Sequence, residues 1–178
     1  MSQVGKLNMV NAKLGATMPG QQTTRYIYDS ITTAAGQSFY SFFQTFAGKT
    51  DLQSNLTTNK LDSSESMVIK SIYVGGDITS TLAGHSNLNI TVGNQVVLKD
   101  FNLAFNAGNR GVSYDRLHSG FNNDSILEIR LLTDIVIPPQ VNFKATLELA
   151  EGAAVLADEN ITLGFKGYGT IFSAGSTF

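Results

Sequence analysis

Cysteine is absent from the 178 residues of this chain, and tryptophan is absent as well. Without cysteine the chain cannot build a disulfide framework, a thiolate zinc site or a cysteine nucleophile. Histidine occurs only at His85 and His118, which lie far apart in the sequence. A metal site of the cupin type needs several histidines that converge with a carboxylate on one cation. The sequence therefore excludes a cupin enzyme.

Charged residues are also few, at 15 % of the chain, where about a quarter is usual in soluble domains. The formal net charge of −2 argues against a general nucleic-acid binder. No apolar run approaches the roughly 20 residues that a helix needs to cross a bilayer. Residues 1–24 lack the apolar block of a secretory signal, so we expect synthesis in a cytoplasm.

Sequence motifs for catalysis are weak or missing. Asp115, His118 and Ser119 lie close in sequence, but a Ser-His-Asp triad draws its members from separate elements, and no nucleophile-elbow motif is present. No phosphate-binding glycine loop occurs. Asn122–Asp124 could offer oxygen ligands to calcium, although the EF-hand spacing is missing and turn chemistry is the simpler interpretation. We expect a protein that is not an enzyme and needs no cofactor.

Uncharged polar residues take the place of charge, with 14 Asn, 8 Gln, 16 Ser and 17 Thr. Together with 17 Gly and only 3 Pro, this composition favours strands and turns over long helices. Depletion of charge is also typical of surfaces that other protein chains cover. The composition indicates an all-β protein that contacts copies of itself or other partners.

Strict alternation of apolar and polar residues marks the clearest strand, 141–149 (VNFKATLEL). The same period recurs in 160–172 (NITLGFKGYGTIF), where three glycines indicate a bulge or a close backbone contact. Two further strands are expected at 66–74 and 125–133. The apolar faces of the best strands predict five core residues: Phe143, Leu147, Ile161, Leu163 and Phe165.

A hairpin is predicted over 87–98, because the Gly93-Asn94 pair between two apolar stretches is a tight-turn signal. A separate short strand is expected at 100–105. Long polar connections at 47–65 and 106–124 are typical of Greek-key sandwiches and jelly rolls. We predict seven to nine strands in a single antiparallel jelly roll or Greek-key sandwich.

The segment 36–46 (GQSFYSFFQTF) is ambiguous between helix and strand. Its phenylalanines fit helical spacing, yet the series Phe39-Ser41-Phe43 also fits a strand. Aromatic density favours the strand.

Residues 1–24 are predicted to form a flexible N-terminal arm, and residues 25–178 the folded domain. Up to Tyr28 the charged residues are Lys6, Lys13 and Arg25, with no acid, whereas acids exceed bases in the remainder. Such an arm gains order only by contact with something already folded. The three cations are therefore candidate arm contacts to a neighbouring subunit, a membrane surface or a nucleic acid. No catalytic, cofactor-binding or metal-binding residue is assigned.

The alternative function is a non-catalytic carbohydrate-binding or adhesion module. Such a module needs exposed aromatic side chains, and the candidates are Tyr26, Tyr28, Tyr114 and Tyr168. Amphipathic packing, with the ring inward and the hydroxyl outward, is the simpler interpretation of these tyrosines.

Five sequence blocks follow one another over most of residues 36–149: FYSFF (39–43), KTDLQSNL (49–56), KLDSSESMVIKSIYV (60–74), ITVGNQVVLKDFNL (90–103) and LLTDIVIPPQVNFKATLEL (131–149). In this order they resemble the jelly-roll capsid proteins of tailless icosahedral bacteriophages, of the single jelly-roll type. The segment 160–172 fits the closing strand of such a fold.

The resemblance implies a structural virion protein without catalytic residues. Such subunits assemble into trimeric, pentameric or hexameric capsomers that tile a shell around the genome, sometimes over an internal membrane. Many relatives from membrane-containing phages carry two jelly rolls, and 178 residues hold one, so a major shell subunit and a vertex subunit both stay open. The implied partners are copies of the chain and other virion proteins, with membrane or genome contact through the arm and no small-molecule substrate. The implied location is the virion, after synthesis in the host cytoplasm.

Overall fold

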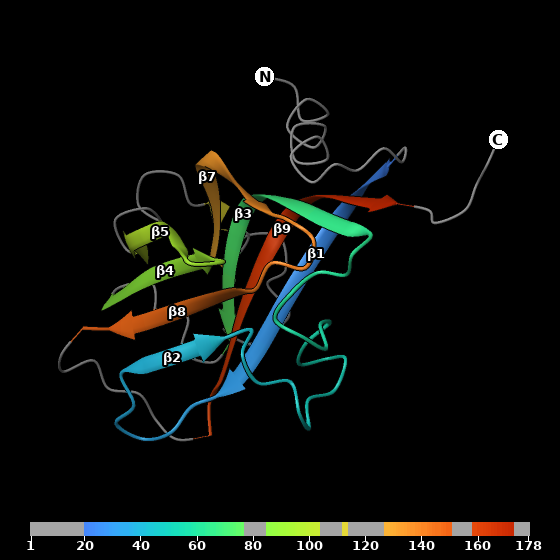
Figure 1. Cartoon of the computed structure of the whole chain (residues 1–178). Helices are drawn as coiled ribbons and strands as arrows, with labels where there is room; N and C mark the ends of the chain where they lie inside the picture. Colours follow the sequence, from blue (N-terminus) through green and yellow to red (C-terminus); the bar gives the residue numbers. More distant parts are fainter. Residues whose placement is uncertain (1–19, 77–84, 104–111, 114–126, 151–157, 173–178) are drawn as a thin grey trace.

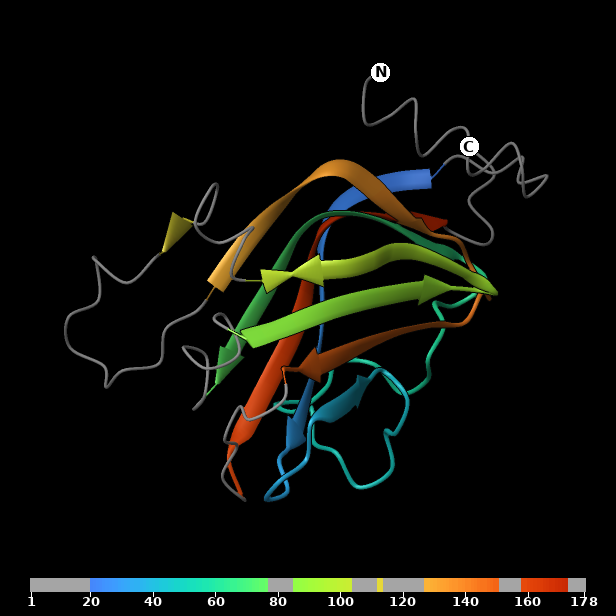
Figure 2. The ribbon, with the colours of Figure 1, turned by 90° about the vertical axis from the view of Figure 1, so that its left-hand side faces the viewer.

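A computed structural model describes residues 20–76, 85–103, 112–113, 127–150 and 158–172 of the chain (Figure 1). Within them, two antiparallel sheets pack together as a sandwich, a five-stranded sheet of order β1-β9-β3-β7-β6 and a four-stranded sheet of order β2-β8-β4-β5 (Figure 2). The all-β prediction is confirmed for these residues. The strands are β1 (Gly20–Thr32), β2 (Phe39–Phe42), β3 (Glu65–Gly76), β4 (Ser86–Val92), β5 (Gln95–Asn102), β6 (Val112–Ser113), β7 (Leu127–Ile137), β8 (Phe143–Leu149) and β9 (Asn160–Phe172).

The core lies between the two sheets and consists of the inward side chains of alternating strand positions. The five residues predicted for it from alternation are all buried there: Phe143, Leu147, Ile161, Leu163 and Phe165. The Phe43 ring joins the two layers, with its centroid 5.3 Å from that of Phe143 in β8 and 5.1 Å from that of Phe165 in β9. Edge-to-face and tilted aromatic pairs of this kind stabilise a core beyond simple area burial.

The strand predicted in the segment 36–46 is confirmed only at β2, where Phe39 and Ser41 face outward. Tyr40 and Phe42 point into the core opposite Leu147 and Ala145 of β8, while the Phe39 side chain is 51 % exposed. Phe43 is buried as well, because its φ of 60° ends the strand and turns its ring inward next to Phe42. A residue in the left-handed backbone conformation interrupts the alternation of inward and outward side chains on which the strand prediction depended.

The predicted hairpin is confirmed as β4 and β5, joined through Gly93-Asn94 with Gly93 at a φ of 61°. The separate strand expected at 100–105 is wrong, since β5 continues to Asn102. A register shift opposite Asn89 divides β5 without ending it. Asp100 has a φ of 49°, and its N–H donates to the Asn89 Oδ1 at 2.7 Å. The bulge explains why the sequence pattern resembled two strands.

β1 was not predicted as a strand, yet it pairs with β9 along its full 13 residues. The pairing runs from Gly20 opposite Phe172 to Thr32 opposite Asn160. The arm boundary expected after residue 24 is therefore too late, because residues 20–24 already belong to the sheet. Residues 1–19 lie outside the described part of the chain.

The five-stranded sheet contains a pronounced irregularity where β3 meets its neighbours. Between the paired positions Ile69 and Ser71, β3 carries the single extra residue Lys70, whereas β7 carries the residues 131–134. Opposite this point in β9, a Cβ on Gly167 would lie 1.9 Å from the Val68 carbonyl oxygen. The close backbone contact predicted from the β9 glycines is thus confirmed. Gly167 also lines a hollow on the outer face of the sheet.

Candidate binding site on the outer face of the five-stranded sheet

Of the three cations proposed as arm contacts, only Arg25 lies in the described residues. It sits on the inward face of β1, two positions before the buried Ile27, and its Nη2 donates to the Glu65 Oε2 at 2.6 Å. Glu65 belongs to β3, so this ion pair bridges across β9 and is only partly exposed. A contact from Arg25 to a neighbouring subunit, a membrane surface or a nucleic acid stays a prediction. Lys6 and Lys13 lie outside the described residues.

The weak chemical motifs of the sequence do not converge in the described part of the chain. His85 is exposed, whereas His118, Tyr114 and Asn122–Asp124 lie outside the described residues. Among the residues that are described, no group of three or more His, Asp or Glu side chains is placed to hold a metal ion. In the same residues, no helix has both the length and the apolar character needed to cross a membrane.

A row of four polar side chains crosses the outer face of the five-stranded sheet. Strand register places Arg130 of β7 opposite Ser71 of β3, Ser71 opposite Lys166 of β9, and Lys166 opposite Tyr26 of β1. Directly opposed side chains of antiparallel strands are near neighbours. Because strands lie about 4.8 Å apart, Arg130 and Lys166 stand about 10 Å apart with a small buried serine between them.

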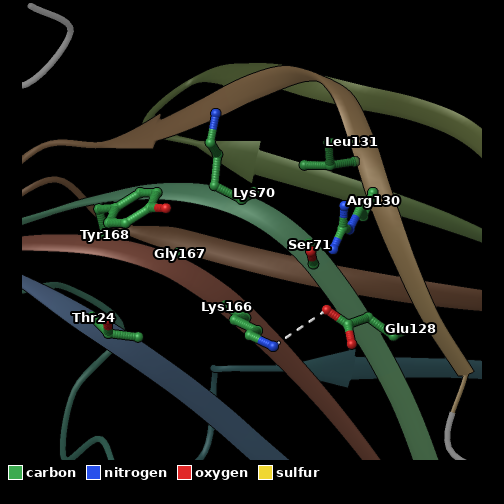
Figure 3. A pocket seen from close by; sticks show the side chains of 9 residues that line it. All are labelled: Thr24, Lys70, Ser71, Glu128, Arg130, Leu131, Lys166, Gly167 and Tyr168. Atoms are coloured by element: carbon green, nitrogen blue, oxygen red, sulfur yellow. Dashed lines mark ion pairs between the residues drawn. The ribbon is translucent and has the colours of Figure 1, made fainter. Parts of the chain in front are cut away.

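Three members of this row, Arg130, Ser71 and Lys166, line one end of a hollow with a volume of about 540 Å³ (Figure 3). In the close-up view, Arg130, Ser71, Lys166 and Glu128 gather at one end, and Lys70 and Tyr168 stand toward the other. The residues that line the hollow are Thr24, Lys70, Ser71, Glu128, Arg130, Leu131, Lys166, Gly167 and Tyr168.

Two of the three cations at this hollow are matched by carboxylates. The Lys70 Nζ lies 2.8 and 2.9 Å from the two carboxylate oxygens of Asp134. The Lys166 Nζ lies 3.6 Å from the Glu128 Oε1 and 5.7 Å from the centroid of the Tyr26 ring. Within the described residues, the exposed Arg130 side chain has no hydrogen-bond or ion-pair partner. The hollow therefore presents one positive charge without a counter-charge, on the Arg130 guanidinium, which has several N–H groups that can donate hydrogen bonds.

Tyrosines flank the row on the same face. The Tyr73 ring lies over Gly164, since a Cβ on that glycine would fall 1.9 Å from the ring. Burial, followed by the neighbouring Tyr28 and Tyr26 hydroxyls, raises the pKa of Tyr73 to about 12. The Tyr28 hydroxyl donates to the Asp51 carbonyl oxygen, and the Tyr26 side chain is 47 % exposed. The ring-inward interpretation is wrong for Tyr26, because its strand position faces away from the core.

Sequence analysis missed this hollow because its residues come from four strands that are far apart along the chain. Only the pairing register places Ser71, Arg130 and Lys166 in one row. One available signal was the alternation of Tyr26 and Tyr28 with Ile27 in β1, which marks two different faces.

Comparison with known proteins adds no relative to this description. No protein-family model matches the sequence, and a search of curated proteins finds no match for it.

Proposed function

We propose that the chain is a capsid subunit, with a single jelly roll that assembles into capsomers of an icosahedral shell. The observation that carries the proposal is the strand order. Apart from the two-residue β6, the sheets read β1-β9-β3-β7 and β2-β8-β4-β5. Two four-stranded sheets connected as Greek keys define a jelly roll, an architecture that recurs in viral shells.

The path of the chain supports the jelly roll in particular. Successive strands alternate between the sheets from β1 to β4, and again from β7 to β9, with the β4–β5 hairpin as the turning point. A long hairpin rolled around a barrel produces this alternation, in which the first strand lies beside the last. The pairing of β1 with β9 along their whole length supports this path.

The exposed surface supports assembly. On β2, β4 and β8 most outward positions are uncharged and polar, namely Ser41, Asn87, Asn89, Thr91 and Thr146, and the charged exceptions there are Lys144 and Glu148. Such a surface can be covered by a neighbour without removing many charges from water, which is costly. Large apolar side chains also stand exposed outside the core, with Leu52 at 89 % and Leu132 at 80 %.

The experiment is light scattering coupled to size-exclusion chromatography, with negative-stain electron microscopy of the eluted protein. A capsid subunit is expected to form a defined oligomer or closed particles at some ionic strength. Leu52→Asp and Leu132→Asp are expected to weaken assembly and leave the fold intact, whereas Thr57→Asp, at another exposed position, serves as the matched control. A chain that stays monomeric under every condition, including with other virion proteins, contradicts the proposal.

A further inference from the structure

We propose that the hollow on the outer face of the five-stranded sheet binds a sugar that carries a carboxylate. The inference concerns a ligand site and does not depend on assembly of the chain into a shell. It follows from the charges, the hydroxyl groups and the size of the hollow, taken in that order.

The charges select a ligand with a single negative charge. Lys70 is paired with Asp134, and Lys166 lies within ion-pair distance of Glu128, so that one cation remains, Arg130. A guanidinium presents a planar fork of donors that matches a carboxylate in a two-point contact. A chain of phosphates would instead bring several negative charges close to Glu128, and like charges repel.

The neighbouring polar groups select a ligand with many hydroxyls. Ser71 offers a hydroxyl at the base of the row, and Thr24 and Tyr168 offer further hydroxyls around the hollow. Glu128 can only accept hydrogen bonds when ionised, so it requires a donor on the ligand. Vicinal sugar hydroxyls both donate and accept, whereas a simple carboxylate such as acetate cannot donate.

The size of the hollow and its aromatic rim fit a sugar ring. A volume of about 540 Å³ falls within the range of small-molecule sites. Tyr168 lines one end of the hollow, and the exposed Tyr26 lies beside the hollow, opposite Lys166 and outside the lining residues. Aromatic faces provide the apolar surface against which the C–H face of a sugar packs.

The test is saturation-transfer difference NMR on the purified full-length protein, a measurement that works on monomers and on large assemblies. The observed ligands are glucuronate, glucose and acetate, and inorganic phosphate, which has no carbon-bound proton to observe, is added as a competitor of glucuronate. Glucuronate is expected to bind saturably with a Kd on the order of 1 mM. Glucose and acetate, which each lack one of the two recognised features, are expected to bind at least about tenfold more weakly.

Two variants assign the contacts. Arg130→Gln is expected to weaken glucuronate binding roughly tenfold without changing the melting temperature, because the side chain is exposed. Glu128→Gln is expected to reduce the preference for glucuronate over acetate. Lys144→Gln is the matched control, since Lys144 is exposed on the outer face of the other sheet, and it is expected to leave binding unchanged.

Four outcomes overturn the inference. The first is the absence of saturable glucuronate binding. The second is binding of acetate or phosphate as tight as that of glucuronate, and the third is binding of glucose as tight as that of glucuronate. The fourth is an Arg130→Gln variant that binds glucuronate like the wild type. Each of them leaves the capsid proposal unaffected, because oligomeric state is measured separately.

Discussion

Phe143 lies at the contact between the two sheets, 2 % exposed and packed against Phe43. Phe143→Ala removes most of a ring from a place that the surrounding strands cannot fill. We expect the free energy of unfolding to fall by roughly 3–5 kcal/mol. Chemical denaturation measures the change, and an unchanged midpoint would show that the ring contributes little to the core.

Asp29 is a buried carboxylate on the inward side of β1. Its Oδ1 accepts from the Lys49 Nζ at 2.6 Å and its Oδ2 accepts from the Phe43 N–H at 2.7 Å. Asp29→Asn keeps an acceptor for Phe43 but leaves the largely buried Lys49 without its counter-charge, at an expected cost of roughly 3–5 kcal/mol. Denaturation of Asp29→Asn, Lys49→Met and the double variant completes a cycle. We expect the double variant to lose less stability than the sum of the singles, and strict additivity would contradict direct coupling.

Tyr73 provides a prediction about pH. Its pKa is raised to about 12 in the folded protein, chiefly by burial, against 10.0 for an ordinary tyrosine. The folded state therefore keeps its phenolic proton where the unfolded state has lost it. The stabilisation is complete below pH 10 and is lost as the pH rises toward 12.

Absorbance of phenolate is the measurement for Tyr73. One of the six tyrosines should titrate near pH 12, and Tyr73→Phe should remove that step. Tyr40 also has a raised pKa, from burial and from the nearby Glu159 carboxylate, so Tyr40→Phe is the control that separates the two. A Tyr73→Phe variant with the same late titration as the wild type would show that Tyr73 is accessible to base.

At the scale of elements, β8 and β9 were predictable because each exposes one face and buries the other, which makes the sequence alternate. β1 was not predictable, because Asp29 occupies an inward position at which the alternating pattern requires an apolar residue. The candidate site could not be predicted from the sequence for a related reason. Its row depends on register across β7, β3 and β9, and the bulge at Lys70, a residue that lines the hollow, has no local sequence signal.

The outer edge of β1 is covered by the connection between β2 and β3. The Asn55 side chain accepts from the Tyr28 N–H at 3.0 Å and donates to the Tyr26 carbonyl at 2.7 Å, and the Ser30 N–H donates to the Gln53 carbonyl at 2.7 Å. One asparagine thus replaces a neighbouring strand over these positions. Capping of this kind keeps a sheet edge from pairing with another chain.

Asn55→Ala is expected to uncover this edge. The loss of two hydrogen bonds to the backbone should lower the free energy of unfolding by about 1–3 kcal/mol and promote irregular aggregation. Thermal unfolding and static light scattering measure the two effects. Thr57→Ala, at an exposed position two residues along, is the control, and equal behaviour of the two variants would contradict the capping role.

At the scale of the whole molecule, the position of β1 decides which residues can be deleted to test the role of the N-terminal arm. Deletion of residues 1–24 would remove five residues that pair with β9 and would damage the sheet itself. Deletion of residues 1–19 leaves β1 complete. If the arm strengthens the proposed assembly, this shorter deletion should leave the melting temperature unchanged and reduce particle size or yield in light scattering and microscopy. Identical assembly of the deleted and full-length chains would leave the arm without that role.

β9 lies between β1 and β3, and it pairs with both. The first strand of the chain therefore has no partner strand in its sheet until the last strand has left the ribosome, and the third strand is until then paired on one edge only, by β7. Contacts between such distant parts of a chain form slowly, and the unpaired edges are exposed to wrong partners in the meantime. Synthesis of the final strand is thus the step that completes the five-stranded sheet, and a chain interrupted before β9 leaves β1 without its partner strand.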